Sequence, residues 1–407
     1  MREMKDSGIE WIGAIPTTWH TQKMKYISNF IQNKYSSDYG LLPYIGLENI
    51  ASWSGSFIST NSQYDREQSL ICEPEDILFG KLRPYLAKVY MNDRLCCCSN
   101  EFAVIRVNGQ NKRYMWYQLL SHGFIFEIDR STYGTKMPRA NAEFIRNVFV
   151  ALPSEIEQQK IANYLDKMCA EIDAVLEKTR ASIEEYKKLK QAVITQAVTK
   201  GIRGDRPMKD SGIEWIGEIS QDFEIVKLKW LCDVLDQFRS PVTADKRNQN
   251  ADVLYDYYGA SGAIDKIDGY TIDDHVMLIG EDGANLRMRS LPIMYEINGK
   301  AWVNNHAHIL KPKAGVDFYF IFYALEALDL NYYITGSAQP KLSQDNLRNI
   351  WVPITDFTGQ KRIAAYISDV CDEFDCLIAK KQQYLTEIEN YKKSLIYEYV
   401  TGKKEVI

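Results

Sequence analysis

The ten residues MKDSGIEWIG stand at positions 4–13 and stand again, unchanged, at positions 208–217. A second pair of similar segments follows each copy at nearly the same separation: PRANAEFIRNVFV at 138–150 and PKLSQDNLRNIWV at 340–352. Self-similarity at a fixed separation indicates a duplicated structural unit. The sequence therefore predicts a pseudo-twofold internal repeat.

The repeat continues into the end of each copy, where residues 161–199 align without gaps with residues 363–401. Between the repeated parts lie two inserts, roughly 30–137 and 235–339, that hardly resemble each other. A frame kept alike around inserts that differ is expected of a protein whose two domains recognise different things.

Residues 154–200 are predicted to form one long helix. Pro153 precedes a capping box of Ser154 and Glu157, and Gly201 marks the far end. Apolar positions spaced alternately four and three apart are typical of a coiled-coil seam. The seam positions are Ile161, Leu165, Met168, Ile172, Val175, Thr179, Ile183, Tyr186, Leu189 and Val193, and in the second copy Ile363, Ile367, Val370, Phe374, Leu377, Lys381, Leu385, Ile388, Tyr391 and Leu395.

We expect these two helices to pack antiparallel within one chain, as a spacer about 65 Å long at ~1.5 Å per residue. A globular domain would then lie at either end. The alternative is that the helices join two copies of the protein, because a helical seam alone does not select its partner.

The inserts carry short runs of strand-forming residues at 42–47, 103–107 and 275–280. Residues 76–85 are predicted to be a buried strand that ends in a basic and aromatic turn. Helical patterns lie near residues 114–128 and 317–329. The fold class is therefore mixed α/β (α+β), with two globular domains separated by two long helices.

The composition favours a folded protein of the cytoplasm. The 407 residues are 45% hydrophobic and 12% aromatic, enough for more than one core. No apolar run approaches the ~20 residues that span a bilayer, and the first residues lack the layout of a signal peptide. The eight cysteines show neither zinc-ligand nor disulfide spacing, so we expect reduced thiols.

A net charge of -5 speaks against a non-specific DNA binder, which is normally basic. Positive charge confined to local faces would remove the objection. Basic residues do occur beside aromatics and glycines in the expected loops, where Arg and Lys suit phosphates and guanine edges. The candidate DNA-binding residues are Lys81, Arg83, Tyr85, Lys136, Arg139, Arg239, Arg287, Arg289 and Lys341.

With the repeated box, the two inserts and the long helices, the chain resembles a specificity subunit of a type I restriction-modification enzyme along essentially its whole length. Besides the DSGIEWIG boxes, the resemblance is carried by YIGLENI at 44–50, DILFGKLRPY at 76–85, YGASG at 258–262, VNNHA at 303–307, QKIA at 159–162 and QKRIA at 360–364.

The resemblance implies two target-recognition domains, at 1–153 and 204–353, that each read half of an asymmetric bipartite site in double-stranded DNA. It implies that conserved helices at 154–203 and 354–407 set the gap between the half-sites and dock two modification subunits. It further implies a non-catalytic chain without a cofactor. The modification subunits would bind S-adenosylmethionine and methylate adenine, and restriction subunits would use ATP and Mg to translocate and cut.

Two other functions deserve comparison. A free-standing enzyme is disfavoured, because the sequence offers no Gly-rich phosphate loop, no methyltransferase motif and no nucleophile triad. His306 and His308 would share one side of a strand, but no third metal ligand is evident, so we expect a structural role. A coiled-coil scaffold that binds only proteins is the remaining alternative, and it would lack sequence-specific affinity for DNA.

Overall fold

The computed structural model describes residues 2–36, 39–60, 68–134, 136–204, 206–244, 247 and 253–406. The chain forms two compact units. Unit 1 comprises residues 1–180 and 382–407, and unit 2 comprises residues 181–381. Among the described residues, no helix combines the length and apolarity needed to cross a membrane.

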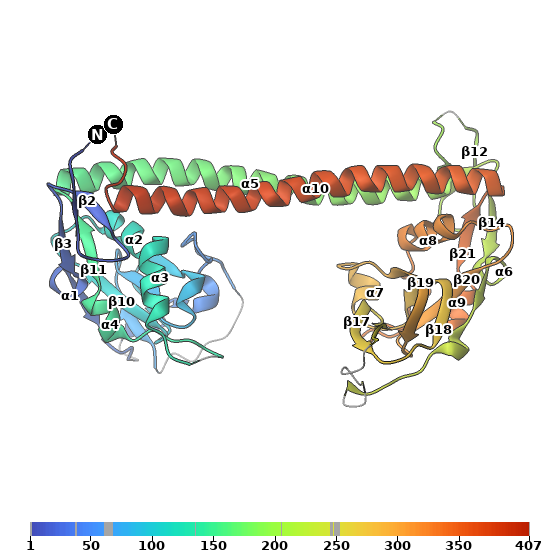
Figure 1. The fold of residues 1–407 in the computed structure, drawn as a ribbon, viewed down its shortest axis with the longest axis horizontal. Coiled ribbons are helices and arrows are strands. Elements are labelled where there is room, and N and C mark those ends of the chain that lie inside the picture. Colours follow the sequence, from blue (N-terminus) through green and yellow to red (C-terminus); the bar gives the residue numbers. More distant parts are fainter. Residues whose placement is uncertain are drawn as a thin grey trace. The chain divides into compact units, whose positions relative to one another are not determined.

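Unit 1 is a mixed α/β domain with both chain ends in it (Figure 1). Its elements are β1 (Met4–Asp6), β2 (Ala14–Pro16), β3 (His20–Lys23), α1 (Met24–Ile27), β4 (Ser28–Ile31), β5 (Tyr44–Ile45), β6 (Leu70–Cys72), β7 (Ile77–Gly80), β8 (Val89–Met91), β9 (Cys96–Cys98), β10 (Phe102–Val107), α2 (Lys112–Leu120), α3 (His122–Arg130), α4 (Ala142–Asn147), β11 (Phe149–Leu152) and the first part of α5 (Glu155–Lys200).

Unit 2 repeats this plan with a larger sheet. Its elements are β12 (Met208–Asp210), β13 (Glu218–Ser220), β14 (Glu224–Lys227), α6 (Leu228–Leu231), β15 (Cys232–Val234), β16 (Tyr255–Gly259), β17 (Gly262–Ile267), β18 (Ile272–Gly280), α7 (Asn285–Met288), β19 (Met294–Val303), β20 (Ala307–Pro312), α8 (Phe318–Ala327), α9 (Gln344–Arg348), β21 (Trp351–Ile354) and the first part of α10 (Phe357–Val400).

The sheets of the two units share a central arrangement. In unit 1 the strand order is β4-β10-β7-β8, and in unit 2 it is β15-β20-β18-β19-β16-β17. The first three strands of each sheet are antiparallel neighbours. The mixed α/β prediction is therefore confirmed, and the two different inserts are built on an equivalent three-stranded core.

The repeated segments form equivalent frames around the two sheets. Each MKDSGIEWIG box supplies the first strand of a two-stranded pair, β1 with β2 and β12 with β13. Each second matching segment supplies a strand that pairs next to the box, β11 with β3 and β21 with β14. The aromatic side chains of Trp19 and Phe223 lie at equivalent places and are both fully buried.

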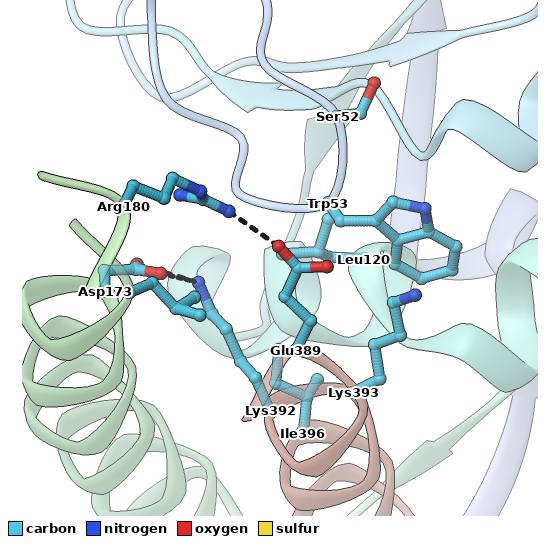
Figure 2. Close-up of a pocket in the computed structure, with 10 residues that line it drawn as sticks. Ser52, Trp53, Leu120, Asp173, Arg180, Glu389, Lys392, Lys393 and Ile396 are labelled. Carbon is cyan, nitrogen blue, oxygen red and sulfur yellow. Dashed lines mark hydrogen bonds and ion pairs between the residues drawn. The ribbon is translucent and has the colours of Figure 1, made fainter. Parts of the chain in front are cut away.

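Both long helices are confirmed, and each is divided between the units. Helix α5 begins one residue after Ser154 and ends at Lys200, next to Gly201 with a φ of 77°. Within unit 1 Asp173 binds Lys392 at 2.7 Å and Arg180 binds Glu389 at 2.6 Å (Figure 2). As the residue numbers rise along α5, the numbers of the partner residues on α10 fall, so the helices are antiparallel in this unit.

Unit 2 contains the ion pair that the repeat makes equivalent to Asp173–Lys392 of unit 1. Lys190 binds Asp375 at 2.7 Å, and the Lys381 ammonium lies 5.3 Å from the centroid of the Tyr186 ring. Positions 173 and 190 of α5 align with positions 375 and 392 of α10. The helices therefore pack antiparallel in unit 2 as well, in the same register.

The predicted seam is correct in part. Ile161, Leu165 and Ile172 are buried, but Val175 and Leu189 are 40% and 51% exposed. The predicted positions Thr179 and Ile183 are buried as well, whereas Leu176 and Ile194 are buried one residue after the predicted Val175 and Val193. On α10 the predicted positions Leu377 and Tyr391 are likewise exposed, and Lys392 is buried instead. The alternating spacing of four and three is therefore kept, but alternate seam positions are shifted by one residue.

Two shorter predictions need correction. The helical pattern at 114–128 is split into α2 and α3 at Ser121, whose hydroxyl accepts from the Phe124 amide at the start of α3. A Ser with this geometry caps a new helix and ends the previous one. The predicted strand at 42–47 is reduced to β5, because a short 3-10 helix begins at Leu47.

Candidate nucleic-acid interface

The candidate interface lies where the central strand of each sheet ends. In unit 1 Gly80, the last residue of β7, pairs with Phe102. In unit 2 Gly280, the last residue of β18, pairs with Ala307. We call these places junction 1 (residues 80–83, 101–103 and 138–142) and junction 2 (residues 280–283, 306–308 and 340–344).

Backbone hydrogen bonds hold junction 1 together. The Lys81 amide donates to the Glu101 carbonyl at 2.8 Å, and the Lys81 carbonyl accepts from the Ala140 amide at 2.9 Å. The Arg83 amide donates to the Pro138 carbonyl at 2.7 Å. The loop after β7 is thus fixed on both sides, by β10 and by the segment before α4.

Junction 2 has the same three bonds. The Glu281 amide donates to the His306 carbonyl at 2.8 Å, and the Glu281 carbonyl accepts from the Leu342 amide at 2.7 Å. The Gly283 amide donates to the Pro340 carbonyl at 3.1 Å. The two junctions therefore share one backbone design, although their inserts hardly resemble each other in sequence.

Junction 1 presents positive side chains. Lys81 is half-buried, and the described part of the chain offers its ammonium no hydrogen-bond or ion-pair partner; burial, followed by the nearby Arg139, lowers its pKa. Arg139 binds Glu101 at 2.9 Å. Arg83 is exposed and adopts a left-handed backbone conformation with φ at 51°. These three predicted residues are brought together.

The remaining two candidates of unit 1 are exposed beside the same loops. Tyr85, in the turn after Arg83, is 44% exposed. Lys136 is exposed in the segment that leads to Arg139. The five candidates of unit 1 thus belong to two adjacent loops, those after β7 and before α4.

Junction 2 is built around a carboxylate instead. Glu281 stands at the position of Lys81 and binds Lys341 at 2.9 Å and also Arg239. Burial alone would raise the pKa of the Glu281 carboxyl, but its hydrogen bonds with Lys341 and Arg239 outweigh burial and lower the pKa. Two of the predicted cations of unit 2 are therefore neutralised in place.

A buried histidine lies beneath this carboxylate. His308 is 1% exposed; its Nδ1 lies 2.7 Å from the Asp236 carboxylate and its Nε2 lies 2.8 Å from the Leu342 carbonyl. Both partners are acceptors, an arrangement that a doubly protonated imidazole satisfies. Gln344 also donates to Asp236, at 2.8 Å. Burial alone would raise the pKa of the Asp236 carboxyl, but its interactions with His308, Gln344 and the Ile309 amide together outweigh burial and lower the pKa.

These contacts bear on the metal alternative. His306 binds Asp282 at 2.7 Å, whereas His308 binds Asp236. Within the described ranges, no group of three or more His, Cys, Asp or Glu side chains is placed to hold a metal ion.

Arg287 and Arg289 donate their guanidinium hydrogen bonds within unit 2. Arg287 donates to the Ile334 carbonyl at 3.1 Å. Arg289 donates to the Glu326 and Leu328 carbonyls at 3.1 and 2.8 Å, and burial lowers its pKa. Both side chains brace loops of unit 2.

Sequence reasoning singled out His308 for a structural role but missed its partners and the other acidic and polar residues at these junctions, namely Glu101, Glu281, Asp236 and Gln344. The repeat offers part of the information needed to find them, because aligning Pro138 with Pro340 also aligns Arg139 with Lys341. The remaining information is the equivalence of β10 with β20, which only the strand register of the structure shows.

Comparisons with known proteins agree on one family. The family model described as "Type I restriction modification DNA specificity domain" matches residues 16–185 and again residues 220–389. The MjaVIII type I restriction enzyme specificity subunit of Methanocaldococcus jannaschii is 25% identical over 74% of this chain and 73% of its own length. The putative MjaX specificity subunit of the same organism is 23% identical over 97% of this chain and 96% of its own length.

Solved structures share the fold. A chain from a structure of a type I R-M system, described by its complex assembly and conformational transition, is 16% identical with a TM-score of 0.75 over 96% of this chain and 99% of its own. The HsdS subunit from Thermoanaerobacter tengcongensis is 17% identical with a TM-score of 0.51 over 96% of this chain and 98% of its own.

Proposed function

The chain belongs to the family of type I restriction-modification specificity subunits, which are the non-catalytic subunits of those systems, and from this premise we propose that each of its units reads one half of an asymmetric bipartite site in double-stranded DNA. One observation supports this proposal above the others. The two junctions share a backbone design but carry opposite charge at its centre, Lys81 in one and Glu281 in the other. A shared scaffold with different side chains is what two readers of different sequences require.

The nine candidate residues are assigned different parts in this proposal. Lys81, Arg83, Tyr85, Lys136 and Arg139 contact one half-site, and Lys341 contacts the other. Arg239 shares Glu281 with Lys341 and sets the charge that the second half-site meets. Arg287 and Arg289 hold the loops of unit 2 in place, since their guanidinium groups already bond backbone carbonyls.

The long helices fix the gap between half-sites in this proposal, because each runs without interruption from one unit into the other. They also dock two modification subunits. Large apolar side chains on α5 and α10 are exposed in both units, which supports docking: Ile156, Val175, Leu189, Tyr366, Leu377, Tyr384 and Tyr391.

The chemistry is assigned to the partners. Modification subunits bind S-adenosylmethionine and methylate adenine, and restriction subunits use ATP and Mg for translocation and cleavage. The complex acts in the cytoplasm, where its DNA substrate lies.

A genome-wide map of adenine methylation tests the reading function. Cells should express the chain with its cognate modification subunit, or that subunit alone. A new asymmetric bipartite motif is expected only when the chain is present. A stable complex without a new motif would favour the protein-binding scaffold.

Two sets of variants refine the map. Arg83→Ala and Arg139→Ala should each alter only the half-site read by unit 1, and equal loss at both half-sites would indicate non-specific charge.

Inserting four residues into both helices at matched positions adds roughly 6 Å at ~1.5 Å per residue. The gap should then grow by about two base pairs at ~3.4 Å each, with both half-sites unchanged.

A further inference from the structure

Unit 1 contains a hollow at junction 1. The cavity has a volume of about 280 Å³, and the residues that line it include Phe30, Gln32, Lys81, Ala103, Asn141 and Arg146. It lies directly beside the loop that carries Lys81 and Arg83.

Strand register identifies what fills this space in unit 2. Ala103 pairs with Phe79 one residue before the end of β7, and His308 pairs with Ile279 one residue before the end of β18. Ala103 and His308 are therefore equivalent, and an imidazole in unit 2 takes the place of a methyl group in unit 1.

The other two members of the buried cluster are replaced in the same way. Ala142 and Gln344 are the first residues of α4 and α9, each after a capping side chain. Gln32 stands at the position of Asp236, because Ile31 pairs with Val104 just as the Leu235 amide donates to the Ile309 carbonyl. Ala103 and Ala142 thus leave space in unit 1, whereas the side chains of His308, Asp236 and Gln344 fill the equivalent space in unit 2.

The lining of the hollow is rich in hydrogen-bond donors. The Lys81 ammonium has no partner among the described residues, and neither has the Gln32 amide. The Asn141 oxygen accepts from the Glu143 amide at 2.8 Å, which leaves the NH2 group of Asn141 to donate. The Arg146 guanidinium stands over the Phe30 ring, 5.7 Å from its centroid, and lies 3.7 Å from the Glu143 carboxylate, which also lines the hollow.

We propose that this hollow is a nucleobase pocket, which receives a base turned out of the DNA duplex at the half-site of unit 1. A paired base cannot enter a concave site, so the occupant must leave the stack. Aromatic and guanidinium planes stack on bases, and side-chain donors read their acceptor edges. Guanine fits best, since its O6 and N7 are the acceptors that a lysine prefers. The pocket rests on the proposed function, and in unit 2 the buried His308 side chain takes the equivalent place.

The test uses the full chain in complex with its cognate modification subunit. In the filled variant, Gln32→Asp, Ala103→His and Ala142→Gln place the side chains of unit 2 into the hollow. Lys81→Met removes the ammonium alone, and Lys34→Met removes a nearby exposed charge that does not itself line the hollow. Each complex is examined by methylation mapping and with duplexes that carry 2-aminopurine at successive positions of the site, whose fluorescence reports loss of stacking.

The wild-type complex should show unstacking at one position of the half-site read by unit 1. Lys81→Met should relax discrimination at that position about tenfold to hundredfold, the range for loss of one good base contact. The filled variant should lose the unstacking signal, whereas Lys34→Met should retain both signals. The half-site of unit 2 should be unchanged throughout.

Absence of unstacking in a wild-type complex that still methylates a bipartite motif would overturn the pocket and leave the proposed function standing. Retention of the signal and the motif in a folded filled variant would overturn it as well. If the filled variant does not fold, Lys81→Met and the wild-type scan decide. Absence of any motif would count against the proposed function itself.

Discussion

Junction 1 and junction 2 have the same backbone, yet one is open and positive and the other is closed around buried charge. The difference depends on a few positions: Lys81 against Glu281, Ala103 against His308 and Ala142 against Gln344. Backbone bonds to strand and loop keep the frame constant. A duplicated domain can therefore acquire a new surface through side chains alone, while stability at that place comes from different sources in the two copies.

The largest effect is expected where buried charges lose their partner. Asp236→Ala removes the acceptor of His308 and Gln344, and leaves a buried donor without compensation. We expect unit 2 to lose about 3–5 kcal/mol of its free energy of unfolding, as for other broken buried ion pairs. Hydrogen exchange of peptides from each unit would measure the loss separately.

The matched control is Gln32→Ala, which changes the equivalent exposed position of unit 1. Its effect should stay within about 0.5 kcal/mol. Similar losses for both variants would mean that the closed junction does not depend on its buried charges.

A smaller contrast is expected between the equivalent ion pairs of the long helices. Asp173→Ala leaves Lys392 unpaired with only 9% of its side chain exposed, whereas Asp375→Ala leaves Lys190 with 25% exposed. The first should cost about 1–2 kcal/mol, because a buried donor is left without an acceptor. The second should cost less than about 1 kcal/mol, since water replaces the lost partner.

Thermal unfolding and hydrogen exchange of the two helices would measure both losses. Asp173→Asn would show whether a neutral acceptor is enough for Lys392. Equal losses in the two pairs would show that burial of the lysine does not matter.

The backbone of the loops that follow β7 in unit 1 and β18 in unit 2 provides a third contrast. Gly283 has a φ of 100°, and a Cβ built there meets nothing within 4 Å, so the cost of Gly283→Ala is conformational alone. We expect a loss of about 1 kcal/mol in unit 2. Arg83→Gly at the equivalent position of unit 1 should instead be neutral or stabilise slightly, because it relieves a left-handed conformation. Denaturant unfolding followed by unit-specific exchange would measure the pair, and destabilisation by Arg83→Gly would contradict the equivalence.

The smallest effect is expected from mild acid. Asp236 and Glu281 in unit 2 have pKa values below their usual ones, so their stabilising contribution is fully present above about pH 4.5, near the unfolded-state values. It is lost as the pH falls through the lower folded-state values. Between pH 7 and pH 4 unit 2 should lose roughly 1 kcal/mol or less through these groups. Exchange rates of peptides that contain residues 236 and 281 should rise before those of junction 1, and the reverse order would contradict the assignment.

Much of the fold could be predicted from local patterns. The repeated boxes, the long helices and the strand at 76–80 depend on spacing and capping signals that neighbouring residues carry. The seam position Val175 was wrong by one residue, because the partner helix decides which of two adjacent apolar residues, Val175 or Leu176, is buried. The candidate site was predicted less well. The basic residues near 81 and 139 do gather, but the sequence does not show that Arg239 faces Glu281 across 42 positions.

The sequence by itself determined that the chain is a duplicated frame with two different inserts, since repetition and periodicity are properties of residue order. Only the tertiary structure decided which cations stay available and which are bound. That outcome depends on strand register, which sets His308 beside Asp236 and leaves Ala103 in the hollow that Gln32 also lines. Register brings together residues far apart in the chain. Because a buried polar group is costly without a hydrogen-bond partner, the stability of each junction then depends on which partners are present.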